Sequence, residues 1–132
     1  MNFNTCSFRV RYGETDQMGV VYHGKYADYL EVGRVEWLRA LGVSYKTMEE
    51  DGVMLPVINL QILYKKSAKY DDLITVKTIL RKVPGVRIIF DYEIYNENKE
   101  LLVEASTTLV FMDKLKMKPI KCPGYILDKL RG

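Results

Sequence analysis

The sequence predicts a single α+β domain in which an antiparallel sheet of about five strands wraps around one long central helix. Two patterns predict this class. A helical pattern of apolar residues occupies the first third of the chain, and four period-two segments typical of strands follow it with short connections between them. The chain has 132 residues, of which 48% are hydrophobic, so it can fill one core. We therefore expect one domain over residues 1–132.

Charge and cysteine content narrow the function classes. The 20 basic and 17 acidic residues leave a net charge of +3 that is not gathered into a long basic run, which argues against nucleic-acid binding as the main role. Cys6 and Cys122 lack a CxxC spacing, so we expect two unpaired thiols in a reducing cytosol. The chain shows no apolar signal segment and no stretch of about 18 apolar residues. We expect a cytoplasmic protein without membrane insertion, metal or cofactor.

The first strand and the main helix are separated by a loop. Residues 5–12 alternate small or polar side chains with apolar and aromatic ones, as strands do, and Gly13 interrupts the pattern. Residues 14–23 then form a loop, and we expect a helix at Lys25–Leu41. Its apolar stripe recurs every three or four residues and consists of Tyr26, Leu30, Gly33, Trp37 and Leu41.

Apolar residues outside this stripe indicate that the helix is buried on both sides. A single half-buried face does not account for Val32, Val35 and Leu38, whereas a sheet that curls around the helix would cover them. Gly42 stands where a left-handed helix cap is expected, and Ser44 can cap a second, shorter helix.

Four strands follow the two helices. Gly52 ends the second helix, and after Pro56 apolar and polar side chains alternate with a period of two. The connections KYDD, VPG and NENKE are short and carry turn residues, so we expect antiparallel neighbours joined by hairpins. Pro123 can start a short last helix. The alternating segments are 58–64, 73–81, 86–95 and 101–112.

The segment RVRYGETDQMGVVYHGKYADYLEVGRVEWLRALG carries the functional information. It places Thr-Asp, then two residues, then Gly-Val-Val-Tyr-His directly ahead of the helix. With the element order after it, this pattern resembles the hotdog-fold acyl-CoA thioesterases, specifically the 4-hydroxybenzoyl-CoA thioesterase family and its bacterial short-chain acyl-CoA thioesterase branch. The resemblance spans nearly the whole chain and implies hydrolysis of an acyl-CoA thioester to a free acid and CoA.

The resemblance also implies site residues and an assembly. The catalytic carboxylate of the family matches Asp16, which acts as a base or a nucleophile. A backbone N–H at the start of the helix, at His23 or Gly24, polarises the thioester carbonyl. The family site forms between two subunits, which implies a homo-oligomer with a dimer as its unit that often pairs into a tetramer.

This chemistry agrees with the residue types. Thioester hydrolysis needs a group that activates water or attacks the acyl carbon, and a positive field where the carbonyl oxygen gains charge. The free N–H groups and the dipole of a helix N-terminus supply that field. Asp16 precedes the helix by a loop long enough to fold back beside it, Gly19 permits a sharp turn or a close approach to a ligand, and Val20 and Val21 can line an acyl pocket.

The other residues of this loop have competing interpretations. His23 either positions the reaction or serves as a capping or packing residue. Tyr22 and Tyr26 either touch the substrate or fill the core. Glu14 is interpreted as a solvated loop charge.

Glu31 is a second candidate for the catalytic carboxylate and is counted among the substrate-binding residues. A different hotdog branch uses a helix glutamate for catalysis, and Glu31 lies one or two turns into the helix. Arg34 follows three positions later, so an ion pair on the helix surface is the alternative.

Coenzyme A carries phosphates that need cationic partners. Basic residues near strand ends or turns are the candidates, and the RKVPGVR hairpin is the strongest contributor. These residues are Lys65, Lys66, Arg81, Lys82 and Arg87.

Two other functions remain open from the sequence. The chain could bind acyl-CoA or an acyl carrier protein without turnover, or it could be a hotdog dehydratase or hydratase. The histidine motif of the dehydratases and the aspartate and histidine pair of the hydratases are both absent.

Overall fold

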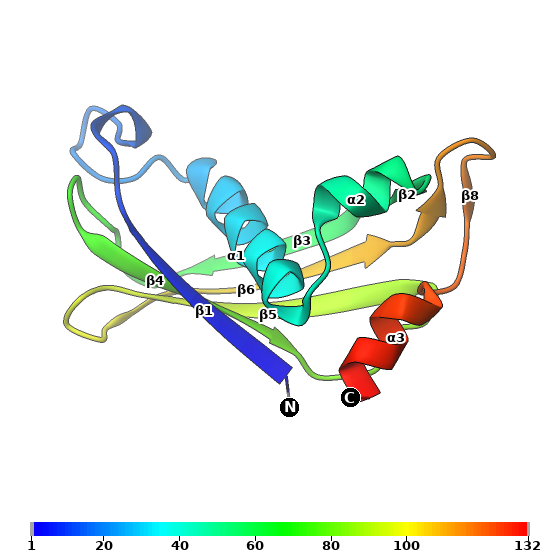
Figure 1. Ribbon diagram of the computed structural model, residues 1–132. Coiled ribbons are helices and arrows are strands. Elements are labelled where there is room, and N and C mark those ends of the chain that lie inside the picture. The colour runs from blue at the N-terminus through cyan, green and yellow to red at the C-terminus, as the bar shows by residue number, and fades with distance from the viewer. Residues whose placement is uncertain (1, 132) are drawn as a thin grey trace.

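In the computed structural model, which describes residues 2–131, five antiparallel strands form one curved sheet, and helix α1 lies across one of its faces (Figure 1). The order of the strands is β1-β4-β5-β6-β3. This arrangement confirms the expected α+β class. The strands are β1 (Asn2–Arg9), β3 (Val57–Tyr64), β4 (Leu73–Leu80), β5 (Arg87–Tyr95) and β6 (Leu101–Val110).

The first strand begins and ends earlier than expected. β1 pairs with β4 from Asn2 opposite Leu80 to Arg9 opposite Leu73. The period-two pattern continues beyond Arg9, but β4 supplies no partner there, so the chain leaves the sheet and forms a short 3-10 helix, η1 (Tyr12–Glu14).

Helix α1 (Lys25–Leu41) has the bounds that the sequence predicts. It ends at Gly42, whose φ of 96° is left-handed and whose N–H donates to carbonyl groups of the last turn. The expectation of burial on both sides is only partly met, because the sheet covers one side of the helix. Leu38 is buried and Val35 is half-buried, whereas Val32 is 41% exposed.

Two shorter helices flank the sheet. α2 (Tyr45–Glu50) begins after Ser44, whose side chain accepts a hydrogen bond from the N–H of Thr47. α3 (Gly124–Arg131) follows Pro123, as expected. None of the helices in residues 2–131 is long and apolar enough to cross a bilayer.

A small second sheet was not predicted. It orders β2 (Val53–Met54), β7 (Met112–Asp113) and β8 (Lys118–Pro119) side by side. Phe111 separates β7 from β6, so the expected strand at 101–112 is divided in two. Strands of two residues are too short to show a period-two pattern.

The connection between β3 and β4 is not a hairpin, so the sequence prediction was wrong here. β3 pairs with β6 at one edge of the sheet, and β4 lies between β1 and β5. The connecting segment contacts the first turn of α1 through Ala68, which is completely buried and whose N–H donates to the hydroxyl of Tyr26 at 3.2 Å. The turn residues of KYDD therefore shape a crossover rather than a two-strand turn. The other two hairpins, β4–β5 and β5–β6, are confirmed.

β3 forms an open edge of the sheet. It pairs with β6 on one side and with no other strand of the described chain. Its apolar side chains are 42% to 56% exposed, although Ile62 packs partly against the core. The exposed apolar residues are Val57, Ile58, Leu60, Leu63 and Tyr64.

Candidate active site

The loop ahead of α1 is closed on itself by backbone hydrogen bonds. Thr15 and Val21 form an antiparallel bridge, and the N–H of Asp16 donates to the carbonyl of Val20 at 2.9 Å. The turn between them needs Gly19, whose φ of 79° is left-handed and whose N–H donates to the carbonyl of Asp16 at 3.0 Å. Asp16 therefore sits at the start of a tight, internally bonded turn.

The crossover segment between β3 and β4 also forms backbone contacts with this loop. Val20 bridges to Lys69, and the N–H of Val21 donates to the carbonyl of Ala68 at 2.8 Å. Residues that are about 48 positions apart in the sequence thus form one backbone unit, which fixes the loop against the core.

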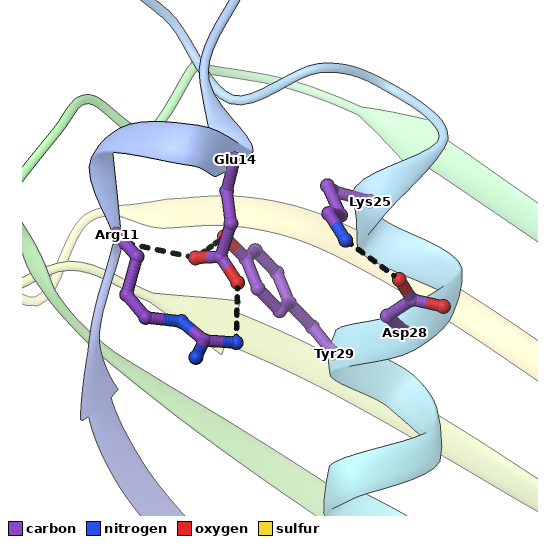
Figure 2. Close-up of polar contacts among 5 residues, drawn as sticks. All are labelled: Arg11, Glu14, Lys25, Asp28 and Tyr29. Carbon is purple, nitrogen blue, oxygen red and sulfur yellow. Dashed lines mark hydrogen bonds and ion pairs between the residues drawn. The ribbon is translucent and has the colours of Figure 1, made fainter.

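Glu14 is buried rather than solvated, which overturns the sequence interpretation. Its side chain reaches into the space between β1 and α1, where one carboxylate oxygen accepts from the N–H of Arg11 at 2.8 Å and from the hydroxyl of Tyr29 at 2.9 Å (Figure 2). The other oxygen lies 3.4 Å from the guanidinium of Arg11. The tight turn of η1 directs the side chain inward, which a count of charges along the sequence cannot show.

The pKa of Glu14 reflects two opposing influences, burial on one side and hydrogen bonds and charge on the other. Burial alone would raise the pKa, but the hydrogen bonds from Arg11 and Tyr29 and the charge of Arg11 outweigh burial and lower it. Burial and the bond to Glu14 in turn raise the pKa of Tyr29. Glu14 is thus a carboxylate and Tyr29 a neutral hydrogen-bond donor, and the pair joins the loop to α1.

A groove of about 320 Å³ opens beside this loop. Asp16 borders it and is half-buried. One of its oxygens accepts from the N–H of Met18 at 2.9 Å, and no group of residues 2–131 donates a hydrogen bond to the other. The groove residues are Asp16, Met18, Val20, Val21, His23, Tyr26, Tyr64, Lys65, Lys66 and Ser67.

His23, two residues before the first residue of α1, lines the same groove. The N–H of Lys25 donates to the carbonyl of Tyr22 at 2.9 Å, and the N–H of Tyr26 donates to the carbonyl of His23 at 3.4 Å. The N–H groups of His23 and Gly24 have no hydrogen-bond acceptor within the described chain. No side chain caps the helix. Such unpaired groups at a helix start carry a partial positive charge that suits a developing oxyanion.

Tyr22 lies over this helix start rather than in the groove lining. A Cβ added at Gly24 would lie 2.7 Å from the ring of Tyr22, which is half exposed, so a larger residue at this position would displace the ring. The ring also packs on the His23 imidazole at 4.5 Å between centroids. In the first turn of the helix, Lys25 and Asp28 form an ion pair at 3.2 Å (Figure 2).

Met18, Tyr64 and Ser67 are groove residues that the sequence reasoning missed. The hydroxyl of Tyr64, at the end of β3, donates to the carbonyl of His23 at 3.1 Å. Leu60, Ile62 and Tyr64 lie opposite three residues of β6 that are buried on the helix side of the sheet, so the period-two pattern contained a signal for the direction of Tyr64.

The structure does not bring Glu31 into the groove. Glu31 is exposed on α1, and the expected ion pair with Arg34 does not form within residues 2–131. Arg34 instead turns inward and is only 8% exposed, beside the phenol of Tyr92. The three-residue spacing permits a pair but does not decide which way the longer side chain points.

The candidate phosphate-binding residues fall into two groups. Lys65 and Lys66 line the groove, and Lys66 forms an ion pair with Glu100. Arg81, Lys82 and Arg87 lie at the β4–β5 turn, at the opposite end of the sheet from Tyr64. Within one chain these three residues are remote from Asp16.

The cysteines match the expectation of free thiols. Cys6 and Cys122 are unpaired. Burial raises the pKa of the Cys122 thiol to about 11, so it is a packed, protonated side chain. Residues 2–131 hold no group of three or more His, Cys, Asp or Glu side chains placed to bind a metal.

Residues 10–130 match the model of the thioesterase-like superfamily. The chain belongs to this superfamily. The match covers the Asp16 loop, the helix and the whole sheet from β3 onward, and it confirms the resemblance to the hotdog-fold thioesterases.

Individual thioesterase relatives extend over most of the chain. Acyl-CoA thioester hydrolase YbgC of Escherichia coli O6:H1 is 33% identical over 132 residues, which cover 97% of this chain and 98% of that protein. Acyl-CoA thioesterase YbgC of Haemophilus influenzae is 38% identical over 126 residues, 93% and 92% of the two chains. The crystal structure of DHNA-CoA thioesterase from Staphylococcus aureus matches with a TM-score of 0.88 and 41% identity, over 92% of this chain and 81% of that one.

Proposed function

We propose that this thioesterase-like protein hydrolyses acyl-CoA thioesters to a free acid and CoA. One observation carries the proposal: the carboxylate of Asp16 and the start of α1, at His23, border the same groove. The names of the two YbgC relatives give the acyl-CoA substrate class and support its transfer to this chain.

In this mechanism Asp16 activates a water molecule or attacks the acyl carbon itself. The carbonyl oxygen gains negative charge, which the N–H groups of His23 and Gly24 stabilise at the helix N-terminus. The bond between acyl carbon and sulfur breaks, the hydroxyl of water joins the acyl carbon, and the proton goes to the thiolate of CoA. Val20, Val21 and Tyr26 supply an apolar wall for the acyl group.

We propose that the working unit is a homo-oligomer built on the β3 edge. Two β3 strands that pair in antiparallel fashion about a twofold axis bring the Tyr64 end of one beside the Val57 end of the other. Arg87 lies at the Val57 end of the sheet. Lys65 and Lys66 of one chain and Arg87 of the partner subunit would then flank the phosphates of one CoA.

The decisive experiment is an acyl-CoA panel of short, medium, long and aromatic thioesters with detection of free thiol. We expect turnover by the wild type, and a fall in kcat of at least about 100-fold for Asp16→Asn, the lower bound of what a positioned acid or base contributes. Asp128→Asn, an exposed carboxylate on α3, is the matched control and should keep full activity.

Each rival function has a measurement of its own, namely calorimetry with acyl-CoA for a binding protein and an enoyl-CoA hydration assay for a hydratase. Tight binding of acyl-CoA without thiol release would favour a binding protein, and hydration of an enoyl-CoA would favour a hydratase. Turnover that survives Asp16→Asn would remove Asp16 from the mechanism.

A cytoplasmic location stays a prediction.

A further inference from the structure

The hydroxyl of Tyr64 contacts the backbone at the point where the oxyanion donors begin. It donates to the carbonyl of His23 at 3.1 Å, from a strand that is 41 residues further along the chain. The His23 carbonyl and the Gly24 N–H belong to one planar peptide unit and point in opposite directions. A hydrogen bond that fixes the carbonyl therefore also fixes the direction of the Gly24 N–H.

Packing of the Tyr64 ring against Tyr26 fixes the direction of the Tyr64 hydroxyl. Its ring lies edge-on to the ring of Tyr26, with centroids 5.4 Å apart and an interplanar angle of 68°. Tyr26 is 3% exposed, and its own hydroxyl accepts from the N–H of Ala68 at 3.2 Å. The aromatic pair thus links the crossover segment, the end of β3 and the start of α1.

The competing bond to the same carbonyl is weaker. The N–H of Tyr26 reaches the His23 carbonyl at 3.4 Å, which is long for a backbone hydrogen bond. Tyr64 is therefore the main partner of this carbonyl. A bonded carbonyl also polarises the N–H of its own peptide, which strengthens that N–H as a donor.

We propose that Tyr64 is a positioning residue that orients and polarises the His23–Gly24 peptide for the oxyanion. The inference rests on the proposed function, because it assigns Tyr64 to the oxyanion site of the thioesterase. Tyr64 does not touch the reacting atoms. Its effect appears in the transition state, where the oxygen carries charge, so it acts on kcat more than on KM.

Tyr64→Phe removes only the hydroxyl and keeps the aromatic contact. We expect kcat to fall about tenfold while KM stays within about twofold, because the loss affects an interaction made in the transition state. Tyr95→Phe, which removes a hydroxyl bonded to Glu93 on the other face of the sheet, is the matched control and should leave both constants unchanged. A Tyr64→Phe enzyme with the kcat of the wild type would overturn the inference.

A second measurement tests the geometry without any turnover. In a ¹H–¹⁵N spectrum of the intact protein, loss of the bond at the His23 carbonyl should move the Gly24 amide proton upfield in Tyr64→Phe and leave it in place in Tyr95→Phe. An unmoved Gly24 signal would refute the inference even if the acyl-CoA panel shows no activity. Failure of the panel alone would refute the proposed function and leave this test to decide the role of Tyr64.

Discussion

At the scale of single residues, Glu14 links three parts of the structure. Its carboxylate bonds the backbone at Arg11 after β1 and the hydroxyl of Tyr29 on α1, while its own carbonyl accepts from Tyr22 at 2.9 Å. Asp16 lies only two positions further on. A buried charge with these partners favours one conformation of the loop, because any other would leave a carboxylate or a phenol without a bond.

Glu14→Gln should destabilise the fold by about 1–3 kcal/mol at neutral pH, since it removes charge-assisted hydrogen bonds. The pKa of Glu14 is lowered from 4.5 in the folded protein, so the stabilisation is present above the unfolded pKa and is lost as the pH falls through the folded value. The difference in unfolding free energy between variant and wild type should therefore shrink in acid. Urea denaturation at pH 7 and pH 3 measures it.

An exposed glutamate serves as the reference for this prediction. Glu50→Gln, at the end of α2, should change the unfolding free energy by less than about 0.5 kcal/mol at both pH values. A Glu14→Gln cost that is the same at pH 7 and pH 3 would show that the charge is not responsible.

At the scale of elements, the distance between α1 and the sheet is set by Gly33. A Cβ at this position would lie 2.6 Å from Oγ1 of Thr78 and 2.8 Å from Cγ1 of Val76, both on β4. These two β-branched side chains are completely buried and have little freedom to move. The glycine therefore lets the helix rest on the strand, and that position in turn places the helix start beside the groove.

Gly33→Ala should have two opposing effects on the free energy of unfolding. Alanine favours a helix by about 1 kcal/mol over glycine, whereas overpacking a core costs about 1–3 kcal/mol. Because both contacts lie well below normal van der Waals distances, we expect net destabilisation, visible as a lower Tm in calorimetry. Gly85→Ala is the control, since its Cβ meets nothing within 4 Å. A more stable Gly33→Ala protein would contradict the close packing.

At the scale of the whole molecule, the outer edge of β3 has no partner strand within residues 2–131. A long apolar edge strand with unpaired backbone groups favours pairing with another strand, and monomers usually protect such edges with charge or proline. β3 (Val57–Tyr64) contains neither Lys, Arg, Asp, Glu nor Pro. The open edge and its exposed apolar side chains thus support self-association.

We expect the wild type to sediment as a dimer or a larger assembly of the 15.4 kDa chain. Leu60→Lys places a charge at the centre of β3 and should shift the protein toward the monomer in analytical ultracentrifugation. Val83→Lys, in the exposed β4–β5 turn, makes the same chemical change away from the edge and should leave the assembly intact. A wild type that stays monomeric at high concentration would end the β3 proposal.

The sequence by itself determined the parts of this protein that depend on local patterns. The bounds of α1, the left-handed cap at Gly42 and the turn at Gly19 follow from helical periodicity and from conformations that glycine adopts most readily. The loop that carries Asp16 was found through a motif specific to one family. All of these signals lie within residues 16–42.

Only the tertiary structure decided which segments meet. It put β3 at the edge instead of beside β4, turned Glu14 inward, and brought Tyr64 to the carbonyl of His23. The physical reason is that strand order and side-chain direction depend on contacts between residues far apart in the chain, and periodicity carries no record of those contacts.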